Sequence, residues 1–126
     1  MKPLDILIVE DDGSLMVALW DLLTAQGYYA ATANGGEEAI TIALEKHPKL
    51  ILLDLIMPGM GGMAVLRQLR ADAWGAHAKV IVITNLPSET KRAEALALGV
   101  TGFYLKSELP LKKLQEDVRE LLQSVE

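Results

Sequence analysis

Five short runs rich in isoleucine, valine and leucine are separated along this chain by longer segments that mix apolar and polar residues. Three of the runs are apolar without interruption, namely Ile6–Val9, Leu50–Leu53 and Val80–Ile83. Strands that are covered on both faces of a parallel sheet have this pattern, because none of their side chains meets water. The pattern predicts five strands, at Leu4–Val9, Tyr28–Thr32, Lys49–Leu53, Lys79–Ile83 and Gly102–Leu105.

The first two mixed segments have the spacing of amphipathic helices. Asn34 and Glu37 resemble a capping box at the start of the second helix, which Pro48 closes. The first helix stops at Gly27, a favourable residue just past a helix end. Trp20 lies beside the apolar stripe of this first helix and is expected in the core. The stripe consists of Leu15, Ala18, Leu19 and Leu22.

Three further helices are expected in the second half of the chain. Pro87 fits the first turn of the fourth, which ends at Gly99, and Pro110 opens the fifth. The apolar positions of the third and fifth helices are Val65, Leu66 and Leu69, and Leu111, Leu114, Val118, Leu121 and Leu122. Strict alternation of strand and helix predicts an α/β fold, a doubly wound five-stranded parallel sheet with five helices on its two faces.

Composition narrows the class of protein without indicating its function. A chain of 126 residues fits one domain, and the absence of cysteine excludes thiol catalysis and cysteine-based zinc sites. No apolar run approaches the roughly 20 residues of a membrane span and no signal-peptide core follows Met1, so a cytoplasmic location without a membrane partner is expected. The net charge of −5 argues against direct binding of nucleic acid.

Polar residues follow four of the predicted strands. Glu10 and Asp11 follow the first, Asp54 the third, Thr84 the fourth and Lys106 the fifth. The carboxyl ends of parallel strands share one edge, where ligands bind. Clustered carboxylates are unfavourable unless a cation neutralises them, and oxygen ligands without histidine or cysteine suit Mg²⁺ beside phosphates. We therefore expect a magnesium and phosphate site at this edge.

A simpler interpretation is that the run Glu10-Asp11-Asp12 only favours the positive end of the helix that follows it. That interpretation would suffice for a single acidic residue. It does not account for Asp54, Thr84 and Lys106 at three other strand ends. The combined set favours a functional site.

These residues resemble the receiver domain of two-component response regulators, in the chemotaxis-response-regulator-like family. The matching stretches are Ile6–Asp12, Leu52–Gly62, Val80–Thr84 and Gly102–Lys106, and the run from Asp54 to Pro58 is the most specific. The resemblance implies a flavodoxin-like topology with strand order 2-1-3-4-5. It also implies that residues 1–126 form one receiver domain, a signalling switch rather than an enzyme.

The resemblance implies a role for each site residue. Asp54 would be the phosphoacceptor, modified by a sensor histidine kinase or a phosphotransfer protein, and Thr84 and Lys106 would contact the phosphoryl oxygens. Asp11, Asp54, Glu10 through water and the backbone carbonyl of Ile56 would hold Mg²⁺.

The resemblance also implies how the signal leaves the site. Movement of Thr84 toward the phosphoryl group would let Phe103, the switch aromatic, turn inward, unless Phe103 is a simple core residue. The face formed by the fourth helix, fifth strand and fifth helix would then change, with Lys91, Arg92 and Tyr104 exposed on it. A downstream effector or output domain would bind there, and a homodimer through it is open.

Three departures from the family pattern stand out. Ser107 replaces the usual cis-proline, so we expect a trans Lys106–Ser107 bond, an altered loop and a lysine that still reaches the site. Asn85 replaces a small residue and would either narrow access for the phosphodonor or supply a hydrogen bond. Ile56 and Leu86 offer nothing to orient a water, which predicts slow self-dephosphorylation.

Competing functions remain open at this stage. A receiver-like interaction domain that is never phosphorylated is the main alternative. An aspartyl-phosphate hydrolase would need a second carboxylate where Ile56 stands, and a flavin-binding protein would place a phosphate against Glu10 and its acidic neighbours. No catalytic or ligand role is expected for His47 or His77, and Trp74 either covers the sheet end or is exposed.

Overall fold

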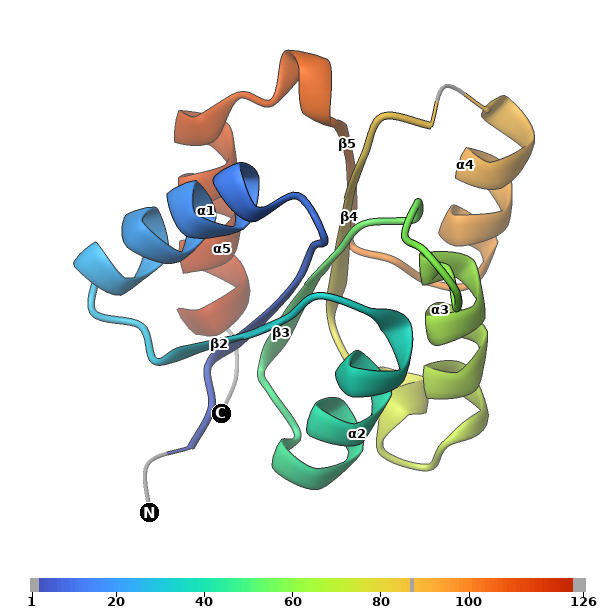
Figure 1. The fold of residues 1–126 in the computed structure, drawn as a ribbon. Coiled ribbons are helices and arrows are strands. Elements are labelled where there is room, and N and C mark those ends of the chain that lie inside the picture. The colour runs from blue at the N-terminus through green and yellow to red at the C-terminus, as the bar shows by residue number, and fades with distance from the viewer. Residues whose placement is uncertain (1–2, 87, 124–126) are drawn as a thin grey trace.

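Residues 3–86 and 88–123 are described here, in a computed structural model of the chain (Figure 1). Five parallel strands form one sheet in the order β2-β1-β3-β4-β5, which confirms the doubly wound α/β fold and the flavodoxin-like strand order. The strands are β1 (Ile6–Val9), β2 (Ala30–Ala33), β3 (Leu50–Leu53), β4 (Val80–Thr84) and β5 (Gly102–Leu105). The bounds of β5 match the prediction, those of β1 to β4 differ from the predicted ranges by one or two residues, and Thr84 belongs to β4 instead of following it.

Five helices cover the two faces of this sheet, α1 and α5 on one and α2, α3 and α4 on the other (Figure 1). Their bounds are α1 (Gly13–Ala25), α2 (Gly36–Lys46), α3 (Gly62–Ala71), α4 (Glu89–Ala97) and α5 (Leu111–Gln123), with short 3₁₀ helices at Gly75–His77 and Lys106–Glu108. No helix within the described ranges has both the length and the apolar character that crossing a bilayer requires.

The sheet separates two apolar cores, which explains the uninterrupted apolar strands. Ile6 and Ile8 pack with the residues of α1 and α5, whereas Leu7 and Val9 pack with those of α2 and α3. Successive side chains of a strand point to opposite faces, so a strand covered on both faces must be apolar at every position. All residues of β1, β3 and β4 are buried.

The predicted capping box of the second helix is wrong by one residue. Gly35 is the N-cap of α2, and the backbone amide of Asn34 donates to Glu38 Oε1 at 3.1 Å, not to Glu37. The helix starts at Gly36, where only glycine fits because a Cβ would lie 2.6 Å from the Met60 carbonyl oxygen. The third helical position is therefore Glu38, the one that reaches back to the preceding turn.

The orientation of α1 also differs from the expected one. Leu19 and Leu23 are buried, and Ala18, expected on the apolar stripe, is exposed. Trp20, expected in the core, is 42% exposed. Successive residues of a helix are about 100° apart around its axis, so the residue after the buried Leu19 points away from the buried row and toward solvent.

Two expectations concern the remaining aromatic and proline positions. Trp74, which precedes the 3₁₀ turn at Gly75–His77, stacks on His47 with ring centroids 4.4 Å apart, so this histidine has a structural partner. Pro87 lies outside the described residues, and α4 has Ser88 as its N-cap.

Candidate functional site

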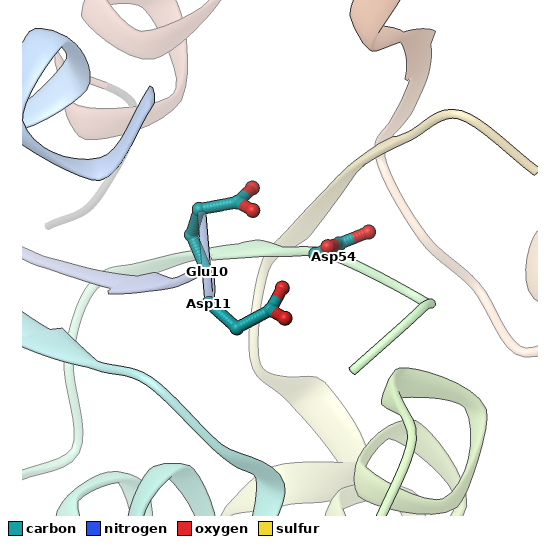
Figure 2. A group of neighbouring side chains, drawn as sticks. All are labelled: Glu10, Asp11 and Asp54. Atoms are coloured by element: carbon teal, nitrogen blue, oxygen red, sulfur yellow. The ribbon is translucent and has the colours of Figure 1, made fainter. Parts of the chain in front are cut away.

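The carboxyl ends of β1 and β3 lie side by side, because Val9 pairs with Leu53. Glu10 and Asp54, the residues that follow this pair, are each only 2% exposed. Asp11 is exposed at the rim, and each of the three carboxylates offers an oxygen within 4.8 Å of the other two. Figure 2 shows the side chains of Glu10 and Asp11 directed toward the region of Asp54. The expected acidic cluster therefore forms at this edge of the sheet.

Lys106 bridges the two buried carboxylates from the end of β5. Its Nζ donates to Glu10 Oε2 at 2.7 Å and to Asp54 Oδ2 at 2.9 Å. No cis peptide bond occurs in the described ranges, so the Lys106–Ser107 bond is trans, as expected. Lys106 still reaches the site with this bond. The loop differs from a simple turn because Lys106–Glu108 forms a 3₁₀ helix.

The ion pair and the burial of its members act on pKa values in opposite directions. Burial would by itself lower the pKa of Lys106, but hydrogen bonds to Glu10 and Asp54 outweigh it and raise that pKa. For Glu10 burial is the stronger effect and raises the pKa of the carboxyl, although Lys106 opposes it. The lysine therefore stays charged, and the two buried carboxylates, Glu10 and Asp54, depend on it for neutralisation.

Backbone amides hold the two buried carboxylates in place. Asp54 Oδ1 accepts from the Ile56 amide at 3.2 Å, while Lys106 occupies the other oxygen. Glu10 Oε2 accepts from the Asp12 amide at 3.0 Å. Both oxygens of Asp54 thus have a donor, which fixes the orientation of the side chain.

The acidic run after β1 divides into separate tasks. Asp12 is the N-cap of α1, and its Oδ1 accepts from the amides of Ser14 and Leu15 at 3.0 and 3.4 Å. The helix-capping interpretation therefore holds for Asp12. Glu10 and Asp11 belong to the carboxylate cluster instead.

Glycine at position 62 lets α3 approach the candidate site closely. A Cβ on Gly62 would lie 2.1 Å from the Asp54 carbonyl oxygen and 2.7 Å from the Leu55 Cα. No side chain fits at that distance from backbone atoms. This contact explains why the motif after Asp54 contains a glycine at the start of the helix.

Thr84 and Phe103 lie on the neighbouring strands β4 and β5. Thr84 is fully buried, and its Oγ1 accepts from the Leu86 amide at 3.3 Å. Phe103 is half-buried at the edge of the core beneath α2, α3 and α4, and the Arg92 guanidinium lies 5.5 Å from the centre of its ring.

Residues around α4 and α5 make contacts that the sequence did not indicate. Tyr104 was expected to be freely exposed, but it is half-buried and its hydroxyl donates to Asp117 of α5. The guanidinium of Arg70 donates to four carbonyl groups, those of Gly75, Ala78, Leu98 and Gly99, and so ties α3 to the end of α4. A lone arginine in a helical pattern carries no signal for such a role.

The fold and the lysine-bridged carboxylates at its carboxyl edge define a class of α/β signalling domain built around a strand-end aspartate. The family model for the response regulator receiver domain matches residues 6–119, and the chain belongs to this family. Receiver domains function in two-component signalling with histidine kinases and output domains. The chain therefore carries a signalling domain.

Two relatives illustrate this membership. The chain is 36% identical over 121 residues to the probable transcriptional regulator ycf27 of Cyanophora paradoxa, covering 96% of this chain and 49% of that protein. It is 38% identical over 101 residues to the response regulator PleD of Caulobacter vibrioides, covering 80% of this chain and 22% of that protein. The chain thus spans about half or less of the length of these curated relatives.

One similar solved structure is the receiver domain of the sensor histidine kinase PA1611 from Pseudomonas aeruginosa PAO1, which has a magnesium ion coordinated in its active site cleft. It superimposes with a TM-score of 0.85 at 24% identity, covering 98% of this chain and all of that one. At this identity the comparison supports the fold.

Proposed function

We propose that this chain is a phosphorylation-dependent switch of a two-component phosphorelay, with Asp54 as the phosphoacceptor. The observation that carries the proposal is the environment of Asp54, a carboxylate 2% exposed with a lysine ammonium 2.9 Å away and two further carboxylates close by. Buried carboxylates paired with a cation at a strand end are typical of a site for a charged ligand. The donor is a histidine kinase or a phosphotransfer protein.

The chemical step requires a nucleophile and charge neutralisation more than proton transfer. A carboxylate oxygen of Asp54 forms a bond to phosphorus while the bond from phosphorus to the donor nitrogen breaks, and the donor imidazole keeps that electron pair. Lys106, whose ammonium group is hydrogen-bonded to Asp54, offsets the charge of the incoming phosphoryl group.

The carboxylate cluster fits Mg²⁺ as the cofactor. It contains only hard oxygen donors, from Glu10, Asp11 and Asp54, and this donor set suits hard divalent ions such as Mg²⁺. Asp11, Asp54, the backbone carbonyl of Ile56 and, through water, Glu10 would hold the ion. When bound, it supplies positive charge against the phosphoryl oxygens. The magnesium ion in the cleft of the PA1611 receiver domain supports this assignment by likeness of fold.

Thr84 and Phe103 form the proposed switch. The Thr84 hydroxyl accepts from the Leu86 amide, which leaves its hydrogen free to donate to a phosphoryl oxygen. Movement of Thr84 toward that oxygen makes room for Phe103 to turn inward. The contact of Phe103 with Arg92 would then break, at a cost of about 1 kcal/mol for an exposed cation–π pair.

The output follows from where these residues lie. Phe103 is on β5 and Arg92 on α4, so the α4–β5–α5 face changes and presents the signal to an effector, an output domain or a second copy. We propose residues 1–126 as one receiver domain in the cytoplasm, which assists its own phosphorylation and dephosphorylation and does not itself bind nucleic acid. Ile56, where a hydrolase needs a carboxylate, disfavours turnover of external substrates.

Incubation with acetyl phosphate and Mg²⁺, followed by intact-mass measurement, tests this function. Wild type should gain one phosphoryl group only when Mg²⁺ is present, and Asp54→Asn should gain none. Asp12→Asn is the matched control, because Asp12 caps α1 and an asparagine caps equally well. An unmodified wild type would favour the alternative, a receiver-like domain that is never phosphorylated.

A further inference from the structure

The two departures from the family pattern at positions 85 and 107 contact each other. The backbone amide of Ser107 donates to Asn85 Oδ1 at 3.0 Å. A proline at 107 has no such hydrogen, and a small residue at 85 has no such acceptor. Each departure therefore supplies the group that the other needs.

The position of this bond relates it to the site. Thr84 and Leu105 form the last residue pair between β4 and β5. Asn85 follows Thr84, and Ser107 follows Lys106, so the bond extends the pairing of β4 and β5 beyond its end. It joins the residue that follows the switch hydroxyl at the end of β4 to the 3₁₀ turn that carries the lysine.

We propose that Asn85 and the Ser107 amide form a latch that keeps Lys106 on Asp54, which makes Asn85 a positioning residue for phosphorylation. This inference rests on the proposed function of Asp54. Lys106 holds its place through a turn of three residues, and the Ser107 bond fastens the middle of that turn to β4. A long, rotatable side chain is positioned well only when the backbone that carries it is fixed.

The latch is weak enough to respond to the switch. Both Asn85 and Ser107 are exposed, and one exposed hydrogen bond has a modest net effect. Movement of Thr84 toward the phosphoryl group carries Asn85 with it, so the same movement alters the hold on the lysine turn. The latch thereby couples the two residues that contact the phosphoryl group.

Asn85 could instead act by narrowing the entrance to the site. The two interpretations predict opposite effects of Asn85→Ala on phosphorylation, faster if Asn85 narrows the entrance and slower if it positions Lys106. If Asn85 only narrowed access, Asn85→Ala would lower the acetyl phosphate concentration that gives half the maximal rate and leave the maximal rate alone. If Asn85 positions Lys106, the same change lowers the rate at saturating acetyl phosphate, by about fivefold for the loss of one such hydrogen bond.

The experiment measures the phosphorylation rate against acetyl phosphate concentration, with Mg²⁺ present, for wild type and Asn85→Ala. Amide hydrogen exchange at Ser107, followed by NMR without phosphodonor, is measured in parallel. Asn34→Ala is the control, since Asn34 is also exposed after a strand of this sheet and bonds to Glu38 through its backbone. We expect a lower saturating rate and faster exchange at Ser107 in Asn85→Ala only.

Two results would overturn the latch. One is an unchanged saturating rate in Asn85→Ala, whatever happens to the half-saturating concentration. The other is unchanged exchange at Ser107, which would mean that the bond does not protect the amide. Failure of the proposed function looks different, because wild type itself would then not be phosphorylated on Asp54, while the exchange measurement would still report on the Asn85–Ser107 bond.

Discussion

Lys106 Nζ lies 2.7 Å from Glu10 Oε2, closer than it lies to Asp54, and so joins residues 96 positions apart in the chain. The ammonium group therefore serves as a structural counter-ion before any ligand arrives. A buried carboxylate that loses its only cation is strongly destabilised. The Glu10 and Asp54 carboxylates would therefore repel each other unless Lys106 or a bound cation neutralised them.

Lys106→Met should lower the free energy of unfolding in the absence of Mg²⁺ by about 2 kcal/mol, less than for a fully buried pair because the lysine is partly exposed. Added Mg²⁺ should recover part of this loss, since an ion bound only by the folded state stabilises it. Urea unfolding with and without Mg²⁺ measures both effects. Lys112→Met, an exposed position on α5, is the control, and an equal loss there would contradict the account.

Gly62→Ala should destabilise the protein by about 2 kcal/mol or more, because the added Cβ meets the Asp54 carbonyl oxygen at 2.1 Å and backbone atoms cannot give way. Gly13→Ala is a matched control, since a Cβ there has nothing within 4 Å and alanine favours a helix. Thermal unfolding compares the two variants. Equal stability of both would show that α3 does not pack against Asp54 as described.

Phosphorylated Asp54 should be long-lived, because the side chains two residues beyond Asp54 and Thr84 are apolar. Ile56 is 51% exposed, so a polar replacement there would reach solvent beside the site. Ile56→Asn with Leu86→Glu should accelerate loss of the phosphoryl group by about tenfold, by orienting a water for attack. The decay is followed by intact mass after removal of the donor.

The matched control for this prediction is Ile56→Leu with Leu86→Met, which keeps both positions apolar. Its decay rate should equal that of wild type. If the polar pair decayed no faster than this control, water orientation at these two positions would not set the lifetime.

Tyr104 links β5 to α5 in a pH-dependent way. Burial and the bond to Asp117 raise the pKa of Tyr104 from 10.0 to about 12. Because the fold favours the neutral hydroxyl, its contribution to stability is complete below pH 10 and is lost as the pH rises to about 12. The stability difference between wild type and Tyr104→Phe should therefore shrink over this range, as measured by urea unfolding. A difference that stayed constant up to pH 12 would contradict it.

The strand-end positions of Asp54, Thr84 and Lys106 were predictable because each ends a run of apolar residues, and a parallel sheet brings such ends to one edge. The separate tasks of the neighbouring acids could not be predicted from their charge, and only the family resemblance distinguished them. Glu10, Asp11 and Asp12 have the same charge, and only the path of the chain into α1 decides which one caps the helix.

Other details depend on where an element starts or how it turns. Because α2 starts at Gly36, Glu38 and not Glu37 accepts the bond from the Asn34 amide. The rotation of α1 about its axis leaves Trp20 exposed. The Asn85–Ser107 bond joins two loops through a side chain, so neither residue predicts it alone. Periodicity describes an element by itself, whereas such contacts arise only when elements meet.

The most direct test of the central claim is to locate the phosphoryl group. Borohydride reduces an acyl phosphate to an alcohol, which converts a phosphorylated aspartate into homoserine and marks the residue for peptide mass mapping. After treatment with acetyl phosphate and Mg²⁺, the account predicts homoserine at position 54 and at neither 11 nor 12. Homoserine at Asp11 or Asp12, or at no aspartate in the chain, would contradict it.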